Sequence, residues 1–314
     1  MADFQLNILG CGSATPSLRH IPTCQVVDFR NKLMMIDCGE GAQLAMRRMR
    51  LKFSRLTNIF ISHLHGDHCL GLPGLLSTLA LQEVGGTVTI HTFADGAEIL
   101  GKVFDFFCRE HSFNLEFNII KPERAIIYED KAMTVETFPL YHRVPCTGFI
   151  FREKPKLRHI IRDMVDAYNV PIAQMQALKE GADFITDDGR VIENSRLTTA
   201  ASPSISYAYC SDTLYDPRVA EAVKGVDVIY HEATYIEADA EKAHQRGHAT
   251  ATEAARVAVE AGAKMLVLGH YSKSYLNEDT HLAEARAYAD AHGRSDMQIF
   301  LANEGLSLDL TTCR

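Results

Sequence analysis

The sequence predicts an α/β fold in which two stacked mixed sheets are flanked by helices. Apolar runs typical of buried strands alternate with segments of helical periodicity along most of the 314 residues. Polar residues recur directly after strands in both halves of the chain, which suits two stacked sheets. The length suffices for one large α/β domain or for two fused halves.

The composition excludes several classes of protein. Hydrophobic residues make up 46% and charged residues 23%, as in ordinary soluble globular proteins, and no apolar run approaches the roughly 20 residues that span a membrane. The first residues lack the basic segment of a signal peptide, and the eight cysteines form no C-x-x-C pair. We therefore expect reduced thiols and a cytoplasmic location. The net charge of −8 argues mildly against a nucleic-acid partner, although the distribution of charge matters more than its sum.

The first part of the chain is predicted to alternate strands with a helix. Strands are expected over 4–9, 24–29 and 32–37, the last two joined as a hairpin. The turn Gly10-Cys11-Gly12-Ser13 either brings the backbone close to an active cavity or cradles a phosphate. Asp37 either orients a ligand histidine or caps the helix that follows it.

A run of five basic residues stands without an acid between Glu40 and residue 59: Arg47, Arg48, Arg50, Lys52 and Arg55. A solvated helix face is the usual explanation of such a run. In an acidic protein, however, it is also a place where phosphate contacts are expected, with Arg47 and Arg48 as the candidates.

The most informative stretch is Ile59-Phe60-Ile61-Ser62-His63-Leu64-His65-Gly66-Asp67-His68. An apolar strand leads directly into three histidines and a carboxylate within six residues. His63 and His65 sit at period two and can aim their rings the same way, while Asp67 and His68 lie across the turn. Donors packed this closely suit a pair of metal ions better than one ion. A helix is expected after the loop, at 72–79.

Later strand ends supply the remaining donors. The predicted strands at 133–138 and 263–268 are followed by the candidate ligands His142 and His270, and the predicted strand over 206–213 ends in the acid Asp212. The other expected elements are strands at 87–93, 117–120, 125–128, 226–230 and 297–301, and helices at 96–109, 160–168, 253–261, 280–292 and from Asp216-Pro217. Thr250 or Thr252 is expected to cap the helix at 253–261.

The seven candidate ligands form two sets of three, with one carboxylate left to bridge them: His63, His65 and His142; Asp67, His68 and His270; and Asp212. Imidazole and carboxylate donors without cysteine suit two Zn²⁺ ions held open for catalysis, although Mn²⁺ or Fe²⁺ could enter. A pair of such ions can generate hydroxide near neutral pH and stabilise both the attacking and the leaving oxygen.

Residues 152–200 differ in composition from the predicted core strands on either side, since the segment begins with many basic residues. We interpret it as an insertion between core strands, in the form of a protruding arm. From Arg143 to Arg162, six Lys or Arg residues stand against Glu153 alone. The segment is either a surface loop without function or a place where substrate binds.

Together these stretches resemble the metallo-β-lactamase superfamily and, within it, the short-form ribonuclease Z family of tRNA 3′-processing endonucleases. The H-x-H-x-D-H motif at 63–68 indicates the superfamily only. The narrower resemblance rests on four further stretches: Asp37-Cys38-Gly39-Glu40-Gly41; Tyr209-Cys210-Ser211-Asp212-Thr213; His231-Glu232-Ala233-Thr234 with Gly247-His248; and Gly269-His270-Tyr271-Ser272. The resemblance runs nearly end to end and implies a single αββα sandwich domain over residues 1–314, with the insertion as its arm.

The resemblance also implies the reaction, which is zinc-dependent removal of the 3′ trailer from precursor tRNA. Hydroxide held by the metal ions would attack the phosphorus, with Asp67 orienting or deprotonating it. His248, polarised by Glu232, would protonate the leaving oxygen. The products would be a tRNA with a 3′-hydroxyl and a trailer with a 5′-phosphate.

In the family the arm grips the tRNA elbow, and a homodimer lets one subunit's arm hold the tRNA that the other subunit cuts. Substrate contacts are then expected from the arm and from the stretch after the last ligand histidine: Lys154, Lys156, Arg158, Ser272 and Lys273. Family members usually carry an arginine in that last stretch, and Lys273 would take its place here.

Two alternatives remain open. A general phosphodiesterase or other hydrolase of the same fold would act on small molecules and would not need the arm cations. A non-catalytic nucleic-acid-binding relative would have lost its metals, whereas all seven candidate ligands are present here.

Overall fold

The protein is described by a computed structural model that covers residues 4–108 and 110–314. The chain separates into two compact units. The first unit runs to Arg152 and resumes over Ile205–Cys313, and the second comprises Glu153–Ser204 with Arg314.

The first unit is built on two seven-stranded sheets within the described residues. The first sheet has the order β18-β1-β2-β3-β4-β5-β6, with β1 (Phe4–Gly10), β2 (Cys24–Phe29), β3 (Lys32–Ile36), β4 (Leu56–Phe60), β5 (Gly86–Thr92), β6 (Phe113–Ile119) and β18 (Ser307–Asp309). The second has the order β17-β16-β15-β14-β9-β8-β7, with β7 (Ala125–Glu129), β8 (Met133–Leu140), β9 (Cys146–Glu153), β14 (Ser206–Cys210), β15 (Val228–Glu232), β16 (Met265–Gly269) and β17 (Gln298–Leu301). Both sheets mix parallel and antiparallel pairs.

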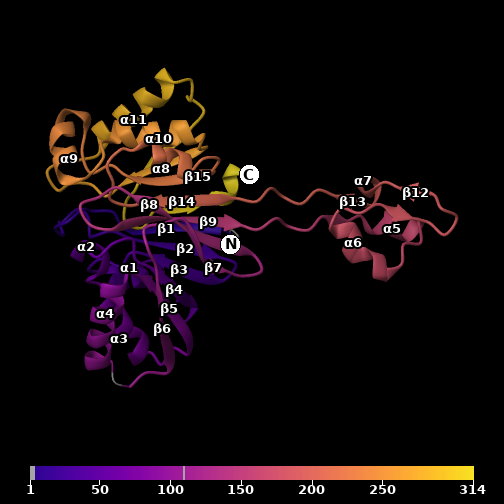
Figure 1. The fold of residues 1–314 in the computed structure, drawn as a ribbon, viewed down its shortest axis with the longest axis horizontal. Coiled ribbons are helices and arrows are strands. Elements are labelled where there is room, and N and C mark those ends of the chain that lie inside the picture. The colour runs from indigo at the N-terminus through magenta and orange to yellow at the C-terminus, as the bar shows by residue number, and fades with distance from the viewer. Residues whose placement is uncertain (1–3, 109) are drawn as a thin grey trace. The chain divides into compact units, whose positions relative to one another are not determined.

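Helices cover the outer faces of the two stacked sheets of the first unit (Figure 1). The first sheet is covered by α1 (Ala42–Arg48), α3 (Leu72–Leu81) and α4 (Ala94–Phe107), and the second by α8 (Pro217–Ala222), α10 (Ala251–Ala261) and α11 (Asp279–Ala291). The short helices α2 (Gly66–Cys69) and α9 (Ala240–Arg246) complete this unit. The αββα sandwich of two mixed sheets predicted from the sequence is confirmed.

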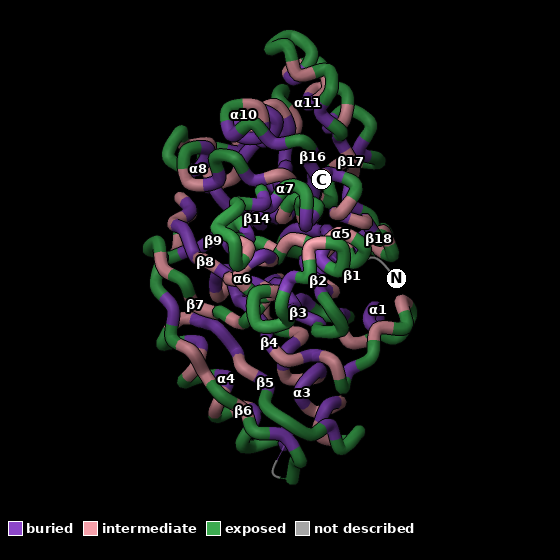
Figure 2. Tube along the Cα trace, turned by 90° about the vertical axis from the view of Figure 1, so that its right-hand side faces the viewer, coloured by how far each residue is buried: buried purple, intermediate pink, exposed green. Residues whose placement is uncertain are grey.

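Strand β3 shows why the sequence forms layers. Met34 and Ile36 belong to the core between the sheets, whereas Leu33 and Met35 belong to the core under the outer helices. Because alternate side chains of a strand point to opposite faces, a strand buried on both faces needs an unbroken apolar run. Figure 2 shows the buried residues concentrated along the strands of both sheets.

The structure corrects two predictions at element level. The strand at 297–301 is not the last, because β18 follows it and pairs with β1 as an edge strand. The predicted helix at 96–109 is α4, which starts at Ala94; Arg109 lies outside the described residues. Strand β9, which directly precedes the second unit, was not predicted. No helix in the described part of the chain is long and apolar enough to cross a membrane.

The second unit has a small core of its own. It contains the helices α5 (Arg162–Ala167), α6 (Met175–Lys179) and α7 (Asn194–Leu197) and the strand pairs β10 (His159–Ile160) with β13 (Thr198–Thr199) and β11 (Phe184–Ile185) with β12 (Val191–Ile192). Six buried residues form its core: Val165, Val170, Leu178, Phe184, Ile192 and Leu197. A segment that buries its own core is more than a surface loop.

Candidate active site

The candidate ligands all follow or flank strand ends of the first unit, as the sequence predicted. The first four come from the loop and short helix after β4, and the others follow β8, β14 and β16: His63, His65, Asp67 and His68; then His142, Asp212 and His270. Because the strands carry them to one place, donor atoms far apart in sequence come within a few ångströms of each other.

One set of donors gathers around Oδ2 of Asp212. Nδ1 of His65 lies 3.0 Å from Nε2 of His63 and 3.3 Å from Nε2 of His142. Oδ2 of Asp212 lies 3.6 Å from His63 Nε2 and 3.9 Å from His142 Nε2. Burial lowers the pKa of all three histidines, which favours the neutral imidazole that binds metals.

The second set gathers around the other oxygen of the same aspartate. Oδ1 of Asp212 lies 3.4 Å from Nε2 of His68 and 3.2 Å from Nε2 of His270. Oδ2 of Asp67 lies 3.6 Å and 3.5 Å from the same two nitrogen atoms. Asp212 thus presents one oxygen to each set, which is the geometry of a bridging carboxylate.

The donors fit two divalent ions. Nε2 of His68, Nε2 of His270 and Oδ1 of Asp212 are buried and have no hydrogen-bond partner among the described residues. Burying a polar atom without a partner costs free energy. A metal ion bound by these three atoms would remove that cost. An ion that binds donors tetrahedrally at about 2.0–2.1 Å holds them roughly 3.3 Å apart, close to the separations found here.

Buried polar groups orient the ligand rings from behind. Oδ2 of Asp37 accepts hydrogen bonds from His68 Nδ1 at 2.8 Å and from the hydroxyl of Tyr209 at 2.7 Å. The Ser62 amide and hydroxyl also donate to this carboxylate, each at 2.8 Å. The interpretation that Asp37 orients a ligand histidine therefore agrees with the structure. The alternative of a helix cap is wrong, because Gly41 precedes α1 and makes no side-chain cap.

Three residues at the site hold the left-handed backbone conformation without being glycine. Ala14 has a φ of 52°, Asp37 of 54° and His270 of 61°. Such backbone strain persists where the surrounding contacts fix it, and it is common at functional sites. The strain at Ala14 coincides with a contact, since its amide donates to Oδ2 of Asp67 at 2.6 Å.

The glycine turn before Ala14 is explained by close packing. A Cβ atom on Gly10 would lie 2.0 Å from the carbonyl oxygen of Pro22, and one on Gly12 would lie 2.9 Å from the Cβ of His20. The turn therefore brings the backbone to the site, and its glycines serve the approach of neighbouring chain.

Glu232 and His248 form a second functional pair beside the donors. Glu232 is fully buried, and its Oε1 lies 2.9 Å from His248 Nδ1. Burial alone would lower the pKa of His248, but the neighbouring Glu232 carboxylate raises it to about 9. His248 also lies 3.9 Å from Oδ2 of Asp212, so the pair adjoins the candidate metal donors.

The basic residues proposed to bind phosphate have different surroundings. Arg55 pairs with Asp28, so it is neutralised within the protein. Arg47 and Arg48 are exposed in the last turn of α1, and Arg47 lies over the ring of Phe53. These two arginines could contact phosphates of a substrate. They could equally belong to a helix face that only contacts solvent, where cations in the last turn stabilise the helix.

The arm cations are partly engaged within the second unit. Nζ of Lys156 lies 2.8 Å from Glu153, and Nε of Arg158 donates to Thr198 Oγ1 at 2.7 Å. In the first unit, Ser272 and Lys273 follow His270 directly, and Lys273 is exposed.

Some site residues escaped the sequence analysis. Thr234 donates to Glu232 at 2.6 Å and contacts Nδ1 of His270 at 2.9 Å, and Gly247 presents its carbonyl to Nδ1 of His142 at 2.7 Å. Thr234 and Gly247 lie inside the stretches quoted for the family resemblance, which was a usable signal. Ala14 carried no such signal, because only its backbone amide acts.

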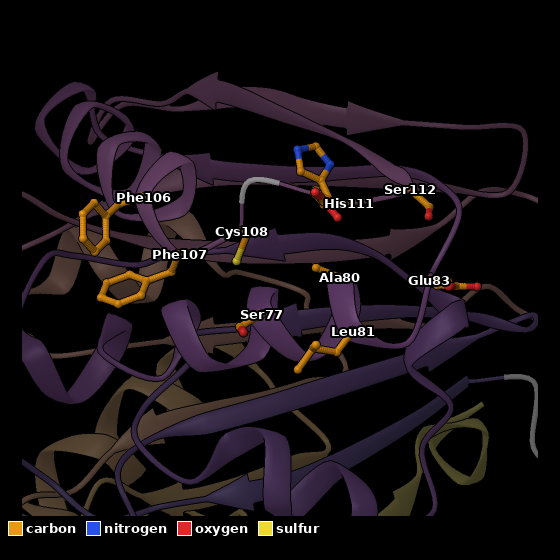
Figure 3. Close-up of a pocket in the computed structure, with 10 residues that line it drawn as sticks. Ser77, Ala80, Leu81, Glu83, Phe106, Phe107, Cys108, His111 and Ser112 are labelled. Atoms are coloured by element: carbon orange, nitrogen blue, oxygen red, sulfur yellow. The ribbon is translucent and has the colours of Figure 1, made fainter.

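A separate pocket of about 870 Å³ lies beside α3 and α4 and contains none of the candidate ligands (Figure 3). Figure 3 shows the rings of Phe106 and Phe107 on one side of it. This pocket is therefore distinct from the candidate active site.

Comparisons with known proteins agree with this geometry. The chain is 52% identical to a ribonuclease Z of Parabacteroides distasonis, over 88% of this chain and 91% of that protein. It is 44% identical to a ribonuclease Z of Porphyromonas gingivalis, over 99% of this chain and 100% of that protein. A family model of the Anti-Pycsar protein Apyc1 matches residues 4–154.

Solved structures share the fold. Human short-form tRNase Z matches with a TM-score of 0.68 at 22% identity, over 98% of this chain and 99% of that chain. The metallo-β-lactamase fold protein YhfI of Bacillus subtilis matches with a TM-score of 0.67 at 16% identity, over 97% and 98%. The identity to the two curated relatives extends over nearly the whole chain, and the resemblance inferred from the motifs is confirmed: the chain belongs to the ribonuclease Z family.

Proposed function

We propose that this chain is a metal-dependent endoribonuclease that removes the 3′ trailer from precursor tRNA. The observation that carries the proposal is the cluster of donors around Asp212 with the Glu232–His248 pair beside it. The 52% identity to a ribonuclease Z favours this activity over a small-molecule hydrolase of the same fold. The intact set of donors argues against a non-catalytic relative.

Two divalent ions would be held by the two donor sets that share Asp212. We propose Zn²⁺, because imidazole nitrogen and carboxylate oxygen at tetrahedral separations suit this ion. When bound, the ions would supply Lewis acidity at the phosphodiester and lower the pKa of the attacking water. Side chains of the protein would orient the water and carry out the two proton transfers.

Asp67 is placed to orient the attacking water and to take its proton. Its Oδ2 accepts a hydrogen bond from the Ala14 amide at 2.6 Å, which holds the carboxylate beside the candidate metal ligands. Hydroxide then adds to phosphorus while the bond from phosphorus to the 3′ oxygen breaks.

His248 is placed to protonate the departing 3′ oxygen. Glu232 accepts the hydrogen bond from Nδ1, so the ring turns its Nε2 proton toward the reaction. After each turnover Asp67 releases its proton to solvent and His248 takes one up from solvent, so both groups return to their starting states. The tRNA leaves with a 3′-hydroxyl, and the trailer keeps the phosphate at its 5′ end.

The second unit is proposed to bind tRNA away from the cleavage point. Its own core supports this role, because a unit that folds around six buried residues can present cations in a fixed array. We further propose a homodimer and a cytoplasmic location, the latter supported by eight cysteines that are all free.

The test compares two substrates on one preparation. The proposal predicts that kcat/KM for a 3′-extended precursor tRNA far exceeds that for bis(4-nitrophenyl) phosphate. It also predicts that K154A lowers only the first value, because the small ester needs no cation outside the metal site. A preparation that prefers the small ester would instead be a general phosphodiesterase.

A further inference from the structure

A pocket of about 460 Å³ adjoins the donor cluster and has no role in the steps derived above. Its apolar walls come from the loop after β4, the start of α4, the end of β6 and the segment before β9: Leu64, Phe93, Ile119 and Val144. His65 also lines it. Because Nδ1 of His65 faces His63 and His142, one ring borders both the donors and the pocket.

We propose that this pocket binds the nucleobase that flanks the scissile phosphate. The inference rests on the proposed function and adds to it a subsite for the RNA chain. A group bound there must lie close to the reacting phosphorus, since His65 separates the two spaces. In an RNA chain, the group within that reach is the base of a nucleotide adjoining the cut.

The lining matches the chemistry of a base. Phe93 supplies an aromatic ring, and aliphatic side chains supply the other walls, so a flat base can stack whatever its identity. Single-stranded RNA ends are commonly bound in this way, with unstacked bases laid on aromatic side chains. A subsite that accepts any base is what an enzyme for many different tRNAs needs.

The rim adds polar groups at the pocket edge. Lys121 and Asp95 are both exposed there, and neither has an ion pair with another described residue. The ammonium of Lys121 suits an adjoining phosphate, and the carboxylate of Asp95 suits an amino or imino group of a base edge. An apolar ligand without polar edges would leave both groups unused.

The start of α4 packs closely against Leu64, in the loop after β4. A Cβ atom on Gly96 would lie 2.7 Å from Cδ2 of Leu64 and 2.5 Å from Oγ1 of Thr92. A larger residue at this position would therefore push the side chains of Leu64 and Thr92 aside. Phe93 directly precedes α4 and is half-buried at this wall of the pocket.

The experiment combines enzyme variants with abasic substrates. Three precursor tRNAs are compared by kcat/KM: the intact molecule, one lacking the base on the 5′ side of the cut, and one lacking the base on the 3′ side. F93L keeps apolar bulk but removes the stacking ring, and I119N is a second variant at an exposed wall position. F106L is the matched control, because Phe106 is an exposed phenylalanine near the other end of α4 and lines the separate pocket of Figure 3.

The proposal predicts that removal of one flanking base lowers kcat/KM of the wild type by about 5- to 150-fold, the range for one lost stacking contact. F93L should lower kcat/KM on the intact precursor by a similar factor and add no further loss on that abasic substrate. The abasic position that abolishes the F93L effect identifies the base as belonging to the tRNA or to the trailer. F106L should match the wild type throughout.

Equal F93L and I119N losses on all three precursors would overturn the proposal, as would wild-type efficiency of both variants on the intact precursor. Failure of the proposed function looks different. In that case the wild type hydrolyses bis(4-nitrophenyl) phosphate and cuts none of the three precursors, and the base subsite is overturned with it.

Discussion

Nδ1 of His248 lies 2.9 Å from Oε1 of Glu232, and this buried carboxylate also accepts hydrogen bonds from the backbone amides of Thr213, Thr234 and Ala249. So many donors fix the carboxylate, and the carboxylate fixes the imidazole ring. The orientation leaves Nε2 as the only ring nitrogen free to reach a leaving group.

The pair predicts a dependence on the leaving group. H248A should lower kcat on precursor tRNA by about 10²- to 10⁴-fold, the usual contribution of a general acid. It should slow bis(4-nitrophenyl) phosphate far less, because nitrophenolate leaves without a proton. Steady-state kinetics on both substrates would show this difference, and H292Q, at an exposed histidine, serves as the control. Equal losses on both substrates would mean that His248 acts in some other way.

Asp212 predicts a change in metal content. Its two oxygens face different donor sets, so D212A should reduce bound zinc from the two ions per chain that we propose to one or none and abolish both activities. Elemental analysis after dialysis against metal-free buffer measures the zinc content. D290N, at an exposed carboxylate, should keep both ions. Retention of two ions by D212A would refute the bridging role.

The sequence predicted which histidines and aspartates come together, because the signals that identify them are local. A strand end, a spacing of two and a histidine-rich turn are visible in order along the chain, and His142, Asp212 and His270 could be found at later strand ends for the same reason. The layered fold followed from unbroken apolar runs that are typical of strands buried on both faces, as in β3.

What the sequence could not supply depends on contacts between distant segments. The amide of Ala14 meets a carboxylate 53 residues away, and any residue type carries such an amide. Strand β18 has only three residues and gains its register from β1, so its own pattern is too short to identify. Asp37 could either orient a ligand histidine or cap a helix, and only its hydrogen-bond partners in the structure distinguish the two roles.

His20 predicts a stability that depends on pH. Its hydrogen bond to Glu304, at 3.0 Å, raises the pKa of His20 above its ordinary value against the effect of burial, and Glu278, Arg19 and Cys11 also adjoin the ring. A raised folded-state pKa means that the stabilisation is complete below the unfolded value of about 6.5 and is lost as pH rises through the folded value.

Urea unfolding of H20Q should therefore show a larger loss of unfolding free energy at pH 6 than at pH 9, relative to the wild type. H159Q, at an exposed histidine of the second unit, should show no such difference between the two pH values. An H20Q loss that is the same at both pH values would mean that the charge of His20 contributes nothing.

Arg47 and Arg48 predict a change in salt dependence. If both contact phosphates, R47Q with R48Q should make the slope of log kcat/KM against log salt concentration shallower by about 1.4–1.8. R218Q with R256Q is the matched control, because these arginines pair with Asp216 and Glu260. An unchanged slope in R47Q with R48Q would favour the solvated helix face.

The most direct measurement maps the cut. Zinc-loaded protein is incubated with a 5′-labelled, 3′-extended precursor tRNA, and the new 3′ end is located, with D67A alongside. We predict one metal-dependent cut next to the discriminator base that leaves a 3′-hydroxyl and is absent in D67A. A precursor that stays intact while the same preparation hydrolyses bis(4-nitrophenyl) phosphate would contradict the assignment of this site to tRNA 3′ processing.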